Sequence, residues 1–276
     1  MESINTAVVA AREKIRLVPV LSMRSCSRVS LGHANRDARR RRAGVLRPVS
    51  SGVVTRLVLV RHGESNATVN RVIGGPRTCA GLSDLGREQA ARLRDRWSAH
   101  AEFEADVLLA SQYPRAIETA EIIAPALHRL TVVRDDGFGE HDPGEECDGL
   151  SYVDFLARYD IGPEAWDSGD PFATTFPGGE TVASFQFRVG SAVRRTLDMY
   201  AGKTVVIACH GGVVDAILRL ALKAPGMGAF QIHTLNTSIT ELLLVKPNVW
   251  RLIRYNDTAH LAGLPANTNP PPTDRV

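Results

Sequence analysis

RLVLVRHGES, at residues 56–65, is an apolar run that ends abruptly in a cation, an imidazole and a glycine. Unbroken runs of β-branched and aliphatic residues are typical of strands buried on both faces, as in a parallel sheet. Ligands of open α/β sheets bind just beyond the carboxyl ends of such strands. The stretch therefore predicts a buried strand over 56–60 that carries Arg61 and His62 to a ligand-binding edge.

The residue types at this strand end favour a phosphate ligand. A Gly directly after His62 lets the backbone approach a bound group closely, and the guanidinium of Arg61 offers a planar fork of donors that matches phosphate. His62 is then a nucleophile, a proton carrier or a metal ligand. A single His that only completes a turn is the competing interpretation, so the prediction depends on partner residues elsewhere.

A second apolar run, residues 204–209, leads in the same way into His210 and Gly211. In a parallel sheet both carboxyl ends lie on one edge, so the two imidazoles can meet there. A third strand, predicted over 106–110, precedes Arg115 in the first turn of a helix. Helix N-termini and Arg side chains both favour anions, so this edge is predicted to bind a dianionic phosphoryl group.

A carboxyl group is the fourth component of the predicted site. Glu140 follows a strand predicted over 130–134, again on the carboxyl side of the sheet, where it can act as a general acid and base. Asp142, Glu145 and Glu146 are alternatives in the same loop. A solvated acidic loop without function is the competing interpretation.

The rest of the body alternates helical and strand patterns. Apolar periodicity and capping residues predict helices over 87–97, 114–127, 151–159, 179–200 and 210–222. A final hairpin is predicted from strands at 238–245 and 249–255. This order predicts a three-layer α/β/α sandwich with a mostly parallel sheet and an antiparallel edge. The chain has no GxGxxG or GxxxxGK[ST] motif, which disfavours a nucleotide-cofactor enzyme.

Charge is distributed unevenly along the 276 residues. Positions 1–52 carry 11 Lys and Arg against 3 Asp and Glu, and the remaining 22 basic and 27 acidic residues give positions 53–276 a net charge of −5. The basic character therefore belongs to the N-terminal segment, and the body does not have the composition of a nucleic-acid binder.

The N-terminal segment is rich in Arg and Ser and poor in acids. This composition fits an organelle transit peptide, a disordered basic arm, or sequence upstream of a later translation start. Because the segment lacks apolar periodicity, we expect a disordered extension over 1–52 without catalytic consequence. A catalytic domain over 53–260 and a disordered, Pro-rich tail over 261–276 complete the predicted organisation.

The cysteines and the length of the apolar stretches indicate the cellular compartment in which the protein is expected. Cys26, Cys79, Cys147 and Cys209 form no CxxC pair and suggest free thiols in a reducing compartment. No apolar stretch approaches the ~20 residues of a membrane helix. We therefore expect a cytoplasmic protein without membrane or nucleic-acid partners, with organelle targeting through residues 1–52 as the alternative.

Five motifs, in this order, resemble those of the histidine phosphatase superfamily, also called the phosphoglycerate-mutase-like family, over about residues 53–260. They are LVLVRHGES (57–65), LSDLGREQA (82–90), SQYPRAIETA (111–120), PGGET (177–181) and ACHGG (208–212). The resemblance implies a phosphohistidine mechanism, in which His62 attacks phosphorus while Glu140 protonates the leaving oxygen and then activates water.

The resemblance also implies how the phosphoryl group is held. Arg61, Arg115 and His210 would neutralise its charge, with Gly211 as a backbone contributor. No metal and no cofactor is implied, since Arg and protonated His supply the positive charge that Mg²⁺ brings to other phosphoryl-transfer sites. The chain departs from the family pattern at Thr68, where an Asn is usual. Thr68 is therefore expected to donate one hydrogen bond to phosphate without an amide fork.

A second departure lies in the acid loop, where Gly149 follows Glu140 by nine positions instead of eight. Phosphatases and mutases share the site, and a mutase needs an elaborate closing lid. The segment 151–175 is of moderate length, so we predict hydrolysis of a small phosphorylated metabolite. A mutase, a non-catalytic phosphate-binding module and a hydrolytic metal site are the alternatives, and a homodimer is left open.

Overall fold

The computed structural model describes residues 53–159, 170–174, 176–227 and 230–265. The predicted extension at 1–52 lies outside these residues, as do positions 266–276 of the predicted tail.

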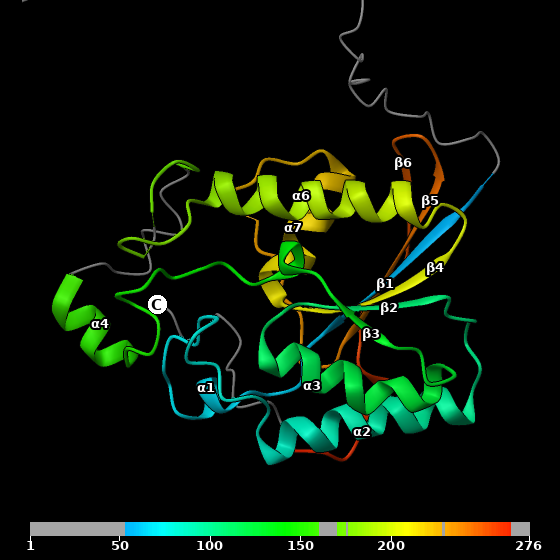
Figure 1. Ribbon diagram of the computed structural model, residues 1–276, viewed down its shortest axis with the longest axis horizontal. Helices are drawn as coiled ribbons and strands as arrows, with labels where there is room; N and C mark the ends of the chain where they lie inside the picture. Colours follow the sequence, from blue (N-terminus) through cyan, green and yellow to red (C-terminus); the bar gives the residue numbers. More distant parts are fainter. Residues whose placement is uncertain (1–52, 160–169, 175, 228–229, 266–276) are drawn as a thin grey trace, which may run out of the picture. The chain divides into compact units, whose positions relative to one another are not determined.

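A sheet of six strands, in the order β3-β2-β4-β1-β5-β6, forms the middle layer of the described chain (Figure 1). The first four strands in this order are parallel, whereas β5 is antiparallel to β1 and to β6. The predicted mostly parallel sheet with an antiparallel edge is thus confirmed. The strands are β1 (Thr55–Arg61), β2 (Val107–Ala110), β3 (Val132–Arg134), β4 (Thr204–Cys209), β5 (Ile239–Lys246) and β6 (Val249–Asp257).

Helices cover both faces of this sheet. In Figure 1, α6 and α7 lie on one side and α2 and α3 on the other. The described helices are α1 (Asn66–Val69), α2 (Asp84–Ala99), α3 (Pro114–Ile123), α4 (Tyr152–Tyr159), α6 (Val182–Met199) and α7 (Gly211–Leu222). Short 3-10 helices occur at Ala124–Leu127, Asp136–Phe138 and Ala259–Leu261. The predicted three-layer α/β/α sandwich is the observed fold.

Apolar and polar residues do not alternate along β1 because helices cover both faces of the sheet. Residues 57–60 are all fully buried, with Leu57 and Leu59 in the apolar cluster beneath α6 and α7. The intervening Val58 and Val60 belong to the cluster beneath α2 and α3. A strand that is covered on both faces must be apolar at every position, which is the pattern that RLVLV displays.

Local hydrogen bonds explain where several helices begin and end. The Ser83 hydroxyl accepts from the backbone N–H of Gly86, so α2 begins at Asp84, three residues before the predicted start. Helix α3 ends at Ile123 instead of Leu127, because Pro125 has no N–H to continue the α-helical ladder and the next turn is a 3-10 helix. No helix is predicted from the sequence at α1, which is only four residues long and is capped by Ser65.

Two glycines hold the turn after β1 against α2. A Cβ atom on Gly86 would lie 2.0 Å from the carbonyl oxygen of Glu64, and one on Gly63 would lie 2.4 Å from the carbonyl oxygen of Gly86. Only glycines permit this approach of two backbones, which fixes the chain immediately after His62.

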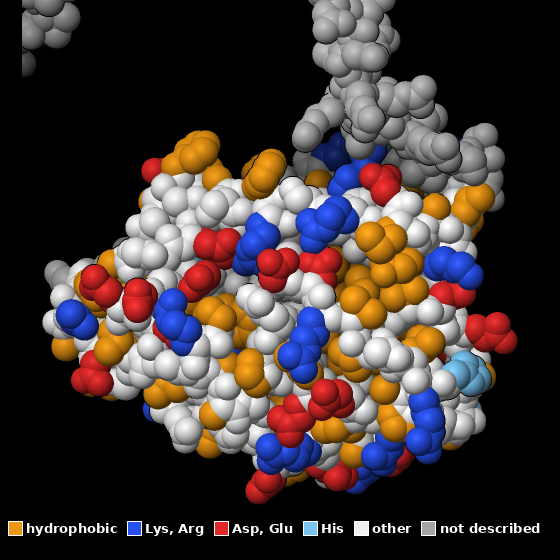
Figure 2. Space-filling view, viewed as in Figure 1, with side chains coloured by type: hydrophobic (Ala, Val, Ile, Leu, Met, Phe, Trp, Pro, Cys, Tyr) orange, Lys and Arg blue, Asp and Glu red, His pale blue; other side chains and the backbone are white. Residues whose placement is uncertain are grey.

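The surface is polar and mixed in charge. Figure 2 shows basic and acidic side chains interspersed over one face of the molecule. No helix in the described ranges is long and apolar enough to cross a membrane. Cys79, Cys147 and Cys209 are buried free thiols, as expected, and Cys209 lies in the apolar core.

Candidate active site

The two histidines meet at the carboxyl edge of the sheet. Strands β1 and β4 are parallel neighbours in which Arg61 pairs with Cys209, so His62 and His210 leave the sheet side by side. Their ring centroids are 5.0 Å apart in an edge-to-face arrangement, and both side chains are buried. The pairing of strands distant in sequence therefore brings together the imidazoles that the sequence analysis selected.

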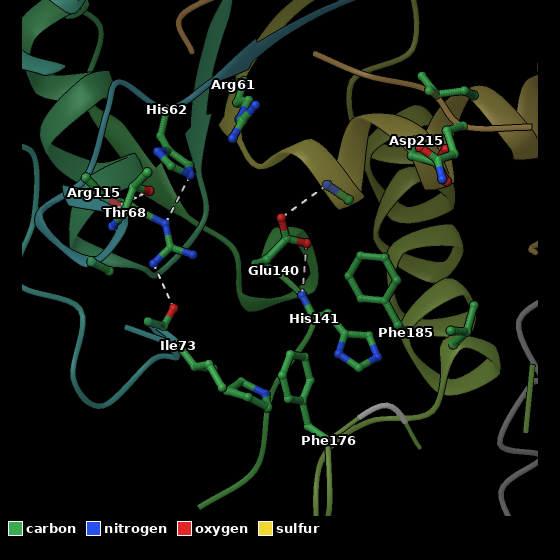
Figure 3. Close-up of a pocket in the computed structure, with 18 of the residues that line it drawn as sticks. Arg61, His62, Thr68, Ile73, Arg115, Glu140, His141, Phe176, Phe185 and Asp215 are labelled. Carbon is green, nitrogen blue, oxygen red and sulfur yellow. Dashed lines mark hydrogen bonds between the residues drawn. The ribbon is translucent and has the colours of Figure 1, made fainter. Parts of the chain in front are cut away.

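Two neighbours of His62 determine which ring nitrogen carries its proton. Nδ1 lies 2.6 Å from the carbonyl oxygen of Gly63, which can only accept. On the other side of the ring, Arg115 donates its Nε–H to Nε2 over 3.1 Å. Nε2 of His62 is therefore unprotonated, and its lone pair accepts the hydrogen bond from Arg115 at the edge of the cavity shown in Figure 3.

Burial also favours a neutral His62. Desolvation, followed by the positive charges of Arg115 and Arg61, holds the pKa of His62 well below its ordinary value of 6.5. The ring is thus a neutral base and a competent nucleophile near pH 7.

The two guanidiniums flank His62. Arg61 donates from Nη1 to the carbonyl oxygen of Thr234, while its buried Nε has no hydrogen-bond partner among the described residues. Arg115 is buried, and its Nη1 donates to the carbonyl oxygen of Gly74 over 2.9 Å. Its position in the first turn of α3 is locally unfavourable for a cation, so an anion in the cavity would complete its surroundings.

His210 lies fully buried beside His62. Its Nε2 lies 2.8 Å from the hydroxyl oxygen of Ser111, and its Nδ1 is buried without a hydrogen-bond partner in the described part of the chain. Desolvation, then the charge of Arg115, lowers the pKa of His210 well below 6.5. Ser111 begins the SQYPRAIETA motif, and its contact with the ring depends on the pairing of β2 with β4.

Glu140 lines the same cavity from the loop after β3, and Figure 3 shows its carboxylate across the cavity from His62. One carboxylate oxygen accepts from the backbone N–H of Gly212 over 3.1 Å, and the other accepts from the N–H of His141 over 3.0 Å. A Cβ atom on Gly212 would lie 2.3 Å from the Glu140 carboxylate, so a larger residue at this position would displace the carboxylate. Gly211 lies near Arg61, since a Cβ atom on it would lie 3.6 Å from Arg61 Nε, and its expected backbone contribution to phosphate binding stays a prediction.

The alternative acids in this loop have other surroundings. Asp142 accepts from the N–H of Gly144 within its own turn, and Glu146 accepts from the hydroxyl of Tyr159 at the surface. Neither these residues nor Glu145 line the cavity. Of the acids in this loop, Glu140 is therefore the one whose side chain lines the cavity.

Arg188 of α6 holds the loop that carries Glu140. Its guanidinium donates to the carbonyl oxygens of Gly139 and Glu140 over 3.0 and 3.1 Å, and to those of Asp136 and Gly137 over 3.3 and 3.2 Å. It also pairs with the Glu180 carboxylate at 2.7 Å. No local pattern identifies this role, because the carbonyls lie about fifty positions away along the chain.

Thr68 lies in α1 and lines the cavity near Arg115 (Figure 3). Its hydroxyl is 3.1 Å from that of Ser65, the N-cap of the same helix. The expected hydrogen bond from Thr68 to phosphate stays a prediction. No cluster of three or more His, Cys, Asp or Glu side chains suited to a metal ion occurs within the described ranges.

The fold and this arrangement of imidazoles and guanidiniums define an α/β enzyme of phosphoryl chemistry. The sequence model of the histidine phosphatase superfamily (branch 1) matches residues 57–258, and the chain belongs to this superfamily. It is accordingly a histidine phosphatase.

Known proteins agree with this assignment. The chain is 31% identical to Phosphoglycerate mutase-like protein 4 of Arabidopsis thaliana over 208 residues, covering 74% of this chain and 86% of the relative. It is 30% identical to Phosphoserine phosphatase 1 of Hydrogenobacter thermophilus, covering 75% and 95%. A solved mycobacterial glucosyl-3-phosphoglycerate phosphatase superposes with a TM-score of 0.63 at 25% identity, covering 74% and 99%.

Proposed function

We propose that this protein hydrolyses a small phosphorylated metabolite through a covalent phosphohistidine on His62, without a metal ion. The observation that carries the proposal is the unprotonated Nε2 of His62, which faces the cavity between two guanidiniums. Glu140 lines the same cavity, so a nucleophile and a proton donor are available to one bound phosphoester.

In the first step, Nε2 of His62 forms a bond to phosphorus while the bond from phosphorus to the ester oxygen breaks. Arg115 moves its Nε–H from His62 to a phosphoryl oxygen as the substrate binds. The buried Nε–H of Arg61 is a second donor, and the unpartnered Nδ1 of His210 is a third when it carries the proton. Donors preorganised around the transferring group are expected to contribute most of the rate enhancement.

Glu140 handles the protons in both steps. Its carboxyl group gives a proton to the leaving oxygen, so the alcohol departs uncharged. The resulting carboxylate then takes a proton from water as the water oxygen attacks phosphorus and the bond to His62 breaks. Inorganic phosphate leaves, and the free enzyme is restored with His62 neutral.

Phosphoenzyme trapping tests this mechanism. Rapid acid-free quenching after mixing with ³²P-labelled p-nitrophenyl phosphate should give a protein label that is stable to alkali and labile to acid. His62→Ala should abolish the label and lower kcat/KM by roughly 10⁴-fold or more. His100→Ala is the matched control, since this exposed residue lies at the end of α2, and should retain the label.

Two outcomes would contradict the proposal. A label that persists in His62→Ala would place the covalent step elsewhere, and activity lost to EDTA and restored by a metal ion would refute the metal-independent part. Transfer of the label to a second acceptor such as 2-phosphoglycerate faster than to water would favour a mutase, the activity suggested by the name of the Arabidopsis relative.

A further inference from the structure

The cavity is much larger than a phosphoryl group requires. It has a volume of about 780 Å³, within the range of sites that enclose whole metabolites. Arg61, His62 and Arg115 occupy one end of it. The remaining volume must therefore receive the body of the alcohol that leaves from phosphorus.

One side of this volume is an aromatic wall, formed by His141, Phe176 and Phe185. The ring centroid of His141 lies 6.0 Å from that of Phe176 and 5.5 Å from that of Phe185. Figure 3 shows the three rings together on the same side of the cavity as Glu140. Because His141 directly follows Glu140, the aromatic wall begins where the general acid meets the leaving oxygen.

Aliphatic side chains of Ile73 and Val182 also line the cavity. Desolvation lowers the pKa of His141, so its ring is neutral near pH 7. The aromatic wall consequently presents uncharged ring surface, against which apolar groups of a ligand are favoured over hydrated ones.

The cationic side chains of this region offer little to a second anionic group. Among the described residues that line the cavity beyond Arg61 and Arg115, the cations are Arg71 and Arg219. Arg219 is paired with Asp215 at 2.7 Å and donates to the carbonyl oxygen of Pro225 over 2.9 Å. Arg71 is exposed, so solvent screens its charge.

We propose that the leaving group of the substrate is an aromatic or bulky apolar alcohol that lies against the aromatic wall, and that it carries no second anionic group. This inference rests on the proposed function, because it assumes that the phosphoryl group is held at His62. The apolar body then extends from the ester oxygen past Glu140 and along the three rings.

A series of three esters with the same type of leaving group tests the inference, so that differences in kcat/KM report on binding of the distal group. 3-Phenylpropyl phosphate, n-propyl phosphate and 2-carboxyethyl phosphate all release a primary alcohol, and they differ chiefly in the distal group. Burial of the phenyl ring should raise kcat/KM about tenfold or more over the propyl ester. The carboxylate ester should be hydrolysed with a lower kcat/KM than the propyl ester.

Variants of the aromatic wall sharpen the test. Phe176→Ala should lower the ratio of kcat/KM for the phenyl ester to that for the propyl ester, and Phe176→Leu should retain part of the ratio because it preserves apolar volume. Phe187→Ala is the matched control: Phe187 lies on α6 like Phe185, is 78% exposed and does not line the cavity. That variant should leave the ratio unchanged.

The inference fails if the phenyl and propyl esters have equal kcat/KM in the wild-type enzyme. It also fails if the carboxylate ester is preferred and Arg71→Ala removes the preference, since Arg71 would then be a second anion site. Both outcomes are measured with an enzyme that still forms phosphohistidine on His62. Absence of any label from all three esters would instead refute the proposed function together with this inference.

Discussion

The two ends of the cavity are built on different parts of the fold. At the end proposed to bind phosphate, called the phosphate-binding end, His62 and His210 directly follow two adjacent parallel strands that are fully buried over residues 57–60 and 205–209. At the acid end, Glu140 lies six positions after β3 in irregular chain, and its carboxylate is held by backbone N–H groups of Gly212 and His141. Strand register fixes the first end, whereas individual hydrogen bonds fix the second.

Because the two ends are held in different ways, mutations at the two ends should have different consequences. A change at the phosphate-binding end removes a reacting group or disturbs the core beneath it. A change around Glu140 can shift the proposed proton donor while leaving the proposed nucleophile, His62, and its guanidiniums in place. The two ends can therefore be tested one at a time, and three predictions do so.

Removing the proton donor should have the largest effect. Glu140→Gln should lower kcat for n-propyl phosphate by about 10²- to 10⁴-fold, because the alkoxide would leave unprotonated. The loss should be much smaller for p-nitrophenyl phosphate, whose phenolate needs no proton. Steady-state kinetics on the two esters measure the contrast, and an equal loss on both would show that Glu140 serves the phosphate-binding end instead.

Loosening the acid loop should have a moderate effect. Arg188→Ala removes the donors to four loop carbonyls and should lower kcat by about 10- to 100-fold through misplacement of Glu140. As in Glu140→Gln, the loss of kcat should be larger for n-propyl phosphate than for p-nitrophenyl phosphate. A variant that was only less stable would lose activity equally on both esters.

Arg194→Ala is the control for this prediction. Arg194 lies on the same helix and forms an exposed pair with Asp198, so its loss should leave kcat and its leaving-group dependence unchanged. A leaving-group dependence that is the same in Arg188→Ala and the wild-type enzyme would refute the positioning role.

The smallest predicted effect is a lowered pKa of His62 at the phosphate-binding end. Because burial and two guanidiniums lower the pKa of His62, its ring should stay neutral as the pH falls and gain a proton only below pH 6.5. ¹⁵N NMR of histidine-labelled protein should show the Nδ1–H tautomer of His62 at pH 7, with the signal assigned by its loss in His62→Ala. A midpoint at or above pH 6.5, or an Nε2–H tautomer, would contradict the geometry described here.

Much of the fold and site was predictable from local sequence. The apolar runs at 57–60 and 205–209 predicted strands buried on both faces, and the observed burial confirms this. Ser83 and Thr181 are caps of helices α2 and α6. In each case the signal and its cause lie within a few residues, because strand periodicity and helix capping are local properties of the chain.

The residues that hold the site were harder to predict. Arg188 and Gly212 belong to helices α6 and α7, and they act on a loop far away in sequence. Asn236 is a further example, since its side-chain amide donates to the backbone carbonyl of His62 over 2.7 Å. A polar residue in a helix or loop has no local pattern that identifies a distant carbonyl as its partner.

The sequence alone determined which reactive groups this protein has and at which strand or helix ends they stand, because periodicity, caps and glycine positions act between near neighbours. Only the tertiary structure decided that β1 pairs with β4, that Arg115 reaches Nε2 of His62, and that Glu140 rests on Gly212. Those contacts join segments 53 to 148 positions apart, and their geometry depends on how the sheet and its helices pack as a whole.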